Sequence, residues 1–156
     1  MFLKNNLSNE QAFKKIKHYC SYQERCHSEV KTKLYSYLLR KNEVEEIISQ
    51  LIEDNYLNEE RFAIRFAGGK FRIKHWGRKK IQYELRQKGV NNFIISIALR
   101  EIDEESYLIT LQKLAQAKWN SLKSENSISR QSKTNAYLLQ KGYEQSLISE
   151  VIISMK

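Results

Sequence analysis

The chain has 156 residues and a net charge of +9, and 41% of its residues are hydrophobic while 29% are charged. The absence of proline, with only five glycines, favours long helices over the many turns of a strand-rich fold. The longest apolar stretch, residues 93–99, is interrupted by Ser96 and is far shorter than the roughly 20 residues of a membrane-spanning helix. Residues 1–6 lack the apolar run of a secretory signal, so we expect a cytoplasmic protein without membrane contact.

Helix-start signals and apolar spacing predict an all-α fold. Asn58 and Asp103 each precede two glutamates, which is typical of a capped helix N-terminus. We expect helices over residues 9–22, 27–40, 43–54, 58–75, 77–88, 91–101, 103–122, 128–141 and 144–154. They group into three-helix units at 1–57, 58–102 and 103–156.

One sequence pattern occurs three times, at residues 38–48, 85–95 and 138–148. Each copy predicts a helix that ends on a lysine, then a residue that tolerates left-handed backbone, then a helix that opens on an aliphatic pair. The left-handed positions are Asn42, Gly89 and Gly142, at offsets of 47 and 53 residues. A unit this small cannot bury its own apolar face, so we expect an elongated, curved array of stacked units.

In the first unit, Cys20 and Cys26 lie six residues apart, with His18 and His27 beside them. This spacing is not the paired Cys-x2-Cys type of a zinc site, and no second ligand pair exists elsewhere. We interpret them as reduced thiols, at least one of them buried, and expect neither a metal nor a cofactor.

The central unit carries most of the charge. Residues 58–102 contain 11 basic and 4 acidic side chains, and so hold +7 of the +9. On the helix over residues 58–75, the spacing of Phe62, Phe66 and Ile73 predicts a buried stripe, and Arg61, Arg65 and Arg72 form a second stripe. The Gly68-Gly69 pair within this helix indicates either close approach of another helix or a bend.

Six basic residues and two aromatic residues lie between residues 70 and 80. Basic side chains beside flat rings suit phosphate contact and base stacking, although the same charge suits an acidic protein groove. A third interpretation is a solvated face on which Phe71 and Trp76 belong to the core. We find no nucleophile with a base, no metal cluster and no paired carboxylates, so the sequence predicts a binding protein and not an enzyme.

Several segments resemble the RecX family of recombination regulators. The central signature is residues 56–63 with Arg72, Gly77, Ile81, 84–85 and 88–90. Residues 25–34 of the first unit, and Lys133 with residues 137–143 of the third, are also similar. The first unit departs from the family by having Asn42 where glycine is usual, and the third unit is less basic.

The resemblance implies three tandem three-helix repeats that bind the groove of the RecA recombinase filament on single-stranded DNA. Such a monomer would inhibit strand exchange and ATP turnover, and so act as a negative regulator of recombination and of the SOS response. The alternative is a helical module that binds nucleic acid directly, and a third possibility is a structural adaptor. The expected contact residues are Arg61, Arg65, Arg72, Lys74, Arg78, Lys79 and Lys80.

Overall fold

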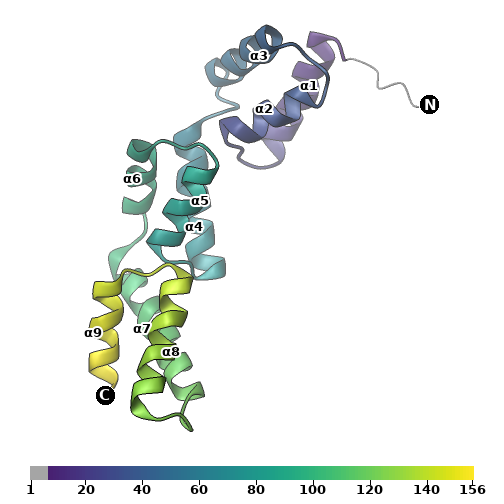
Figure 1. The fold of residues 1–156 in the computed structure, drawn as a ribbon. Helices are drawn as coiled ribbons and strands as arrows, with labels where there is room; N and C mark the ends of the chain where they lie inside the picture. Colours follow the sequence, from purple (N-terminus) through teal and green to yellow (C-terminus); the bar gives the residue numbers. More distant parts are fainter. Residues whose placement is uncertain (1–6) are drawn as a thin grey trace, which may run out of the picture.

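The computed structural model describes residues 7–156. Residues 1–6, on which the secretory-signal argument rests, lie outside this range. The described part contains nine α-helices and no strand, which confirms the all-α prediction. Figure 1 shows an elongated, curved array of three units, α1–α3, α4–α6 and α7–α9. The helices are α1 Asn9–Tyr22, α2 His27–Tyr35, α3 Lys41–Glu53, α4 Glu59–Lys74, α5 Arg78–Gln87, α6 Asn92–Arg100, α7 Glu104–Ser121, α8 Ser127–Lys141 and α9 Gln145–Met155.

The predicted caps begin the first helix of the second and third units. The side chain of Asn58 accepts a hydrogen bond from the Arg61 backbone N–H at 2.9 Å, and Asp103 does the same for Ser106. Each cap satisfies a donor that the first turn would otherwise leave free. The hydrogen bonds from Ser106 also hold the pKa of Asp103 below its usual value.

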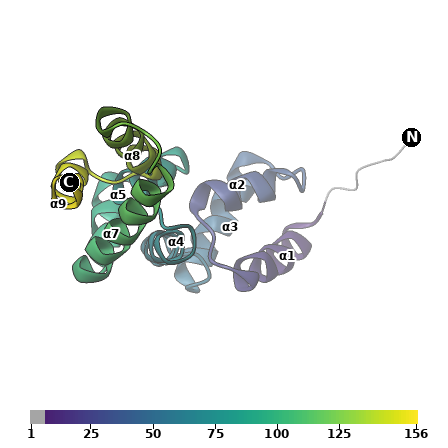
Figure 2. The ribbon, with the colours of Figure 1, turned by 90° about the horizontal axis from the view of Figure 1, so that it is seen from below.

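Residues 7–156 form two hydrophobic cores and not three. The first unit has its own core, which includes Ile16, Leu34 and Leu51. The second and third units share a continuous core, in which Phe71 of α4 packs against Tyr107 of α7 with ring centroids 5.7 Å apart. Among the described residues, whenever two helices are in extensive contact, both belong to the same unit. Helix ends and turns therefore join the units, and Figure 2 shows α1–α3 set to one side of α7–α9.

The second and third units meet where the N-terminus of α5 abuts the turn between α8 and α9. The Gly77 N–H donates to the Lys141 carbonyl at 2.7 Å, and the Lys79 N–H donates to the Gly142 carbonyl at 2.9 Å. The Arg78 N–H donates to the Tyr107 hydroxyl at 3.0 Å. The backbone donors at the start of α5 are therefore satisfied by the next unit, and this contact requires glycine at 77 and 142.

The first repeat register predicted from sequence is wrong. The left-handed residue after α2 is Leu38, with φ of 63°, and it corresponds to Gly89 and Gly142, whose φ values are 83° and 100°. Asn42 lies within the first turn of α3, and α2 ends at Tyr35 and not near residue 40. The offset between the first two units is therefore 51 residues (89 minus 38), whereas the predicted offset of 53 between Gly89 and Gly142 agrees with the structure.

This register predicts opposite effects for two glycine substitutions. We expect Leu38→Gly to be neutral or to stabilise by up to about 1 kcal/mol, because it removes left-handed strain from a side chain that is 44% exposed. Asn42→Gly should destabilise by roughly 0.5 kcal/mol, because glycine weakens a helix. Urea denaturation of both variants measures the difference, and a more stable Asn42→Gly protein would contradict the register.

Two further sequence predictions concern the first unit and the membrane. Cys20 and Cys26 are free and buried, which confirms the thiol interpretation. Cys26 precedes α2, and its Sγ donates to Glu29 Oε1 at 3.0 Å. Between residues 7 and 156, no helix is long and apolar enough to cross a bilayer.

Candidate partner-binding surface

The seven residues expected to contact a partner do not form one surface. Successive residues of an α-helix are rotated by about 100°, so Arg61, Arg65 and Arg72 leave α4 on one side and Lys74 leaves it on the opposite side. The other three, at positions 78–80, form the first turn of α5. Each group therefore has different neighbours.

Arg61 is bound within the molecule. Its Nε donates to Glu24 Oε1 at 2.5 Å, and its two terminal nitrogens donate to the side chain and the backbone carbonyl of Asn55, each at 3.1 Å. Glu24 belongs to the first unit, so this guanidinium links the first unit to the second. Another link is made by Glu59, which accepts from the His27 N–H at 3.1 Å.

Arg78 has the equivalent position at the next junction. Its guanidinium lies 3.8 Å from the ring centre of Tyr107, pairs with Glu144 at 2.7 Å, and also pairs with Glu104. Burial by itself would lower the pKa of Arg78, but its hydrogen bond to Glu144 and the nearby carboxylate charges outweigh burial and raise that pKa. Burial, and then a hydrogen bond to Glu144, raise the pKa of the Tyr107 phenol. Arg78 therefore stabilises the contact between the second and third units.

The remaining predicted residues are available to a partner. Arg65, Arg72, Lys74 and Lys79 are exposed, and Lys80 is half-buried. A Cβ atom at Gly68 would lie 2.7 Å from Arg72 Nη1, so the side chain of Arg72 occupies that space. The three atoms nearest to a Cβ at Gly68 all belong to Arg72 of the same helix, and at Gly69 a Cβ would meet no atom of the described residues within 4 Å, so close approach of another helix does not account for this pair.

Lysines gather around two aromatic rings on the other side of the central unit. We call this the aromatic–lysine surface, formed by Phe66, Lys70, Trp76, Lys80 and Lys88. Lys70 and Lys80 lie 5.0 and 4.7 Å from the ring centre of Trp76, and Lys88 lies 5.7 Å from that of Phe66. The two rings meet edge to face at 6.4 Å. The sequence predicts a buried position for Phe66 and no contact role for Lys88, although the eight-residue spacing of Lys80 and Lys88 places both on one side of α5.

More positive charge adjoins this surface. Burial, and then the charges of Lys80 and Lys74, lower the pKa of Lys141. Lys141 Nζ donates to the Lys74 carbonyl at 2.8 Å, so it is held in place. Glu84 lies between Lys80 and Lys88 on α5, four residues from each. A concentration of like charge such as this opposes folding and favours an anionic partner.

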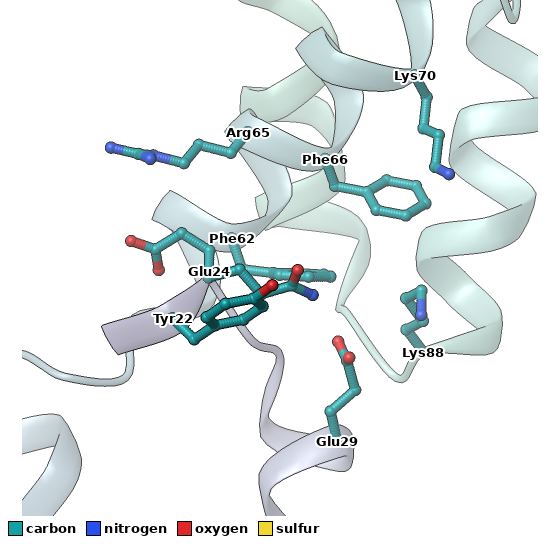
Figure 3. A pocket seen from close by; sticks show the side chains of 9 residues that line it. Tyr22, Glu24, Glu29, Phe62, Arg65, Phe66, Lys70 and Lys88 are labelled. Carbon is teal, nitrogen blue, oxygen red and sulfur yellow. The ribbon is translucent and has the colours of Figure 1, made fainter. Parts of the chain in front are cut away.

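A hollow of about 540 Å³ connects the first unit to this surface. Figure 3 shows Lys70 and Lys88 beside Phe66, whereas Arg65 points away from them. Glu24 and Glu29 line the hollow from the first unit, and Glu24 Oε2 is buried without a hydrogen-bond partner. The hollow therefore has mixed charge, with three cations and two carboxylates in its lining. Within residues 7–156, no group of three or more histidine, cysteine or acidic side chains converges on a metal position.

The geometry defines an all-α repeat protein whose central unit has a surface rich in cations. Residues 58–99 match the family model "RecX, second three-helix domain", and residues 104–152 match "RecX, third three-helix domain". Together these matches cover more than half of the chain. The protein belongs to the RecX family.

Known relatives agree in sequence and in fold. "Regulatory protein RecX" of Bacillus cereus strain B4264 is 28% identical over 99% of this chain, and that of Bacillus thuringiensis strain Al Hakam is 29% identical. The chain spans 58% of the length of each. The crystal structure of RecX from Lactobacillus salivarius superposes with a TM-score of 0.86 at 25% identity, covering 94% of this chain and 95% of that one.

Proposed function

We propose that this protein binds the RecA filament on single-stranded DNA and suppresses its activities in recombination and in the SOS response. Membership of the RecX regulatory family is the observation that carries the proposal. The excess positive charge of the central unit supports it, because such a surface attracts an anionic partner. On this proposal the protein is a cytoplasmic monomer that acts by occupancy and not by catalysis, and its functional units are 1–57, 58–102 and 103–156.

An elongated molecule can inhibit the filament by touching it through exposed cations at several points. Several weak contacts on one body bind more tightly together than separately, because the later contacts form at high local concentration. The exposed predicted residues Arg65, Arg72, Lys74 and Lys79, together with the aromatic–lysine surface, are the proposed contacts. Arg61 and Arg78 support binding indirectly, because they hold neighbouring units in position.

The direct test compares three targets: single-stranded DNA alone, RecA alone, and RecA assembled on single-stranded DNA with a nucleotide. We expect this protein to bind most tightly to the assembled filament. We also expect RecA ATP turnover to fall as this protein is added. Equal affinity for bare DNA and for the filament would favour the direct nucleic-acid-binding alternative.

Paired substitutions identify the surface in contact. We expect Lys70→Gln with Lys80→Gln to weaken filament binding roughly tenfold, and salt to weaken the remaining binding less steeply, because fewer charge contacts remain. Arg65→Gln with Arg72→Gln tests the opposite side of α4. Lys113→Gln with Lys123→Gln is the matched control, since both lysines are exposed on the third unit and the same charge is removed. Fluorescence anisotropy measures the filament affinity of each variant. If the Lys70 and Lys80 variant bound as tightly as the control variant, the aromatic–lysine surface would be excluded as a filament contact.

A further inference from the structure

The first unit contains an apolar cleft that the proposed function does not use. It has a volume of about 660 Å³ and lies between α1, the end of α2 and the turn that follows α2. Three tyrosine rings, Tyr19, Tyr22 and Tyr37, supply most of its apolar lining. This volume lies within the range of small-molecule sites, which span roughly 300 to 1,000 Å³.

Cations surround the tyrosines. Lys14 and Lys15 enter from α1, Lys33 from α2, and Arg25 from the loop between these helices. Arg25 is fixed, because its guanidinium lies 3.8 Å from the ring centre of Tyr19 and its Nε donates to the Tyr19 carbonyl at 3.2 Å. The cleft is therefore lined by both positively charged side chains and aromatic rings.

Negative charge is scarce in the cleft. None of its eight lining residues, all within the described range, carries a carboxylate. Glu29, at its margin, approaches Arg25 at 3.9 Å and offsets part of that one charge. Burial raises the pKa of both Tyr19 and Tyr37, so these phenols stay neutral near pH 7. The cleft therefore attracts an anion that also carries a flat apolar group.

Ring availability separates Tyr22 from the other aromatic rings. Within the cleft, Arg25 and Lys33 flank the ring of Tyr19, and Lys15 lies 5.9 Å from the ring centre of Tyr37. Trp76 is already flanked by two lysines and by Phe66, so its ring is engaged within the molecule. Tyr22 is 79% exposed, and among the described residues no ring or cation stacks on it. A nucleobase can therefore stack on Tyr22 without displacing an existing contact.

We propose that this cleft of the first unit binds single-stranded nucleic acid, with a base stacked on Tyr22 and the backbone phosphates on Lys14, Lys15 and Lys33. The arrangement combines a positive groove with an aromatic platform, which is how sequence-independent binders hold a single strand. The acidic-peptide alternative supplies the charge but no flat group to stack on Tyr22, the one tyrosine of the three whose ring carries no cation from the described residues. This binding goes beyond the proposed function and requires no RecA.

The test measures binding of the full chain to a short, labelled oligothymidine without RecA. We expect Tyr22→Ala to weaken binding about tenfold, because the stacking platform is lost, whereas Tyr22→Phe should bind like the parent protein. Lys14→Gln with Lys33→Gln should also weaken binding about tenfold and reduce its salt dependence. An abasic oligonucleotide of equal charge should bind more weakly than oligothymidine.

Matched variants elsewhere on the first unit serve as controls. Tyr35→Ala and the pair Lys31→Gln with Lys41→Gln change exposed residues outside the cleft and should leave binding unchanged. Unchanged affinity in Tyr22→Ala, equal binding of the abasic strand, or equally tight binding of a polyglutamate peptide would each overturn the proposal. Inhibition of RecA ATP turnover is measured separately on the same variants, so failure of this site and failure of the proposed function are distinguishable.

Discussion

Gly142→Ala should destabilise the protein by roughly 3 to 5 kcal/mol, because it combines backbone strain with overpacking. Gly142 has φ of 100°, where an L-residue is strained. A Cβ atom there would also lie 2.3 Å from Lys80 Cβ and 2.6 Å from the Lys80 backbone nitrogen. The first turn of α5 would have to move, and the hydrogen bonds that join the second and third units would be lost.

Two other glycines separate these causes. Gly89 has φ of 83° but open space around it, so Gly89→Ala should cost only the strain, about 1 to 2 kcal/mol. Gly77 has an ordinary φ of −78°, but a Cβ there would lie 2.3 Å from the Gly142 carbonyl carbon and oxygen. Gly77→Ala should therefore report overpacking alone. Urea denaturation of all three variants measures these costs, and equal costs at 89 and 142 would mean that the junction is not tightly packed.

Truncation should have unequal effects at the two ends of the array. A chain of residues 58–156 keeps almost the whole shared core and loses from it only Cys26 of the first unit. A chain of residues 1–102 loses Tyr107, Leu111, Tyr143 and the other third-unit members of that core. Each large apolar side chain left without its packing partner forfeits about 1.5 to 3 kcal/mol. We expect residues 58–156 to fold and the central unit of residues 1–102 to be severely destabilised.

Circular dichroism and thermal unfolding of the two truncated chains check this expectation. The full chain provides the reference, and its first unit should melt separately from the rest because it has its own core. A cooperative unfolding transition of residues 1–102 at the temperature of the full chain would contradict the shared core. The isolated central unit, residues 58–102, is a poor object for binding studies, because part of its core belongs to the next unit.

Local sequence signals predicted most of the helices well. The range 9–22 agrees with α1 at both ends, and the caps at Asn58 and Asp103 form as expected. Glycine signals the left-handed residue in the second and third units, but leucine does not, so the sequence does not reveal Leu38 and the predicted helix over 27–40 is longer than α2. Tertiary context overrides the preference of leucine at this position.

The buried side of α4 was predicted less well. The predicted stripe included Ile73, which is 76% exposed, whereas Phe71 is in the core. Two apolar spacings coexist on this helix, and only packing against α6 and α7 decides between them. Sequence periodicity cannot make that choice, because it contains no information about the neighbouring elements.

The candidate site depended on information that sequence spacing does not contain. Arg61 meets Glu24 from 37 residues away, and Arg78 meets Glu144 from 66 residues away. The charge count identified the central unit correctly as rich in cations, but it could not identify which cations are already paired. The sequence predicts that the basic residues between 70 and 80 lie near Trp76, but the packing of α5 beside α4 determines which of them lie over its ring.

The protein has two classes of electrostatic contact that differ in their sensitivity to salt. In the first class, Arg61 and Arg78 pair with glutamates inside the molecule, and in the second, exposed cations face water. The pairs of Arg61 with Glu24 and of Arg78 with Glu144 involve side chains that are only 18 to 30% exposed, so dissolved salt screens these two pairs weakly. The exposed lysines and arginines face water, where the Debye length at physiological ionic strength is about 8 Å. A rise in salt should therefore release an anionic partner before it alters the curvature of the array. Small-angle scattering of the free protein over the same range of salt should record an unchanged outline.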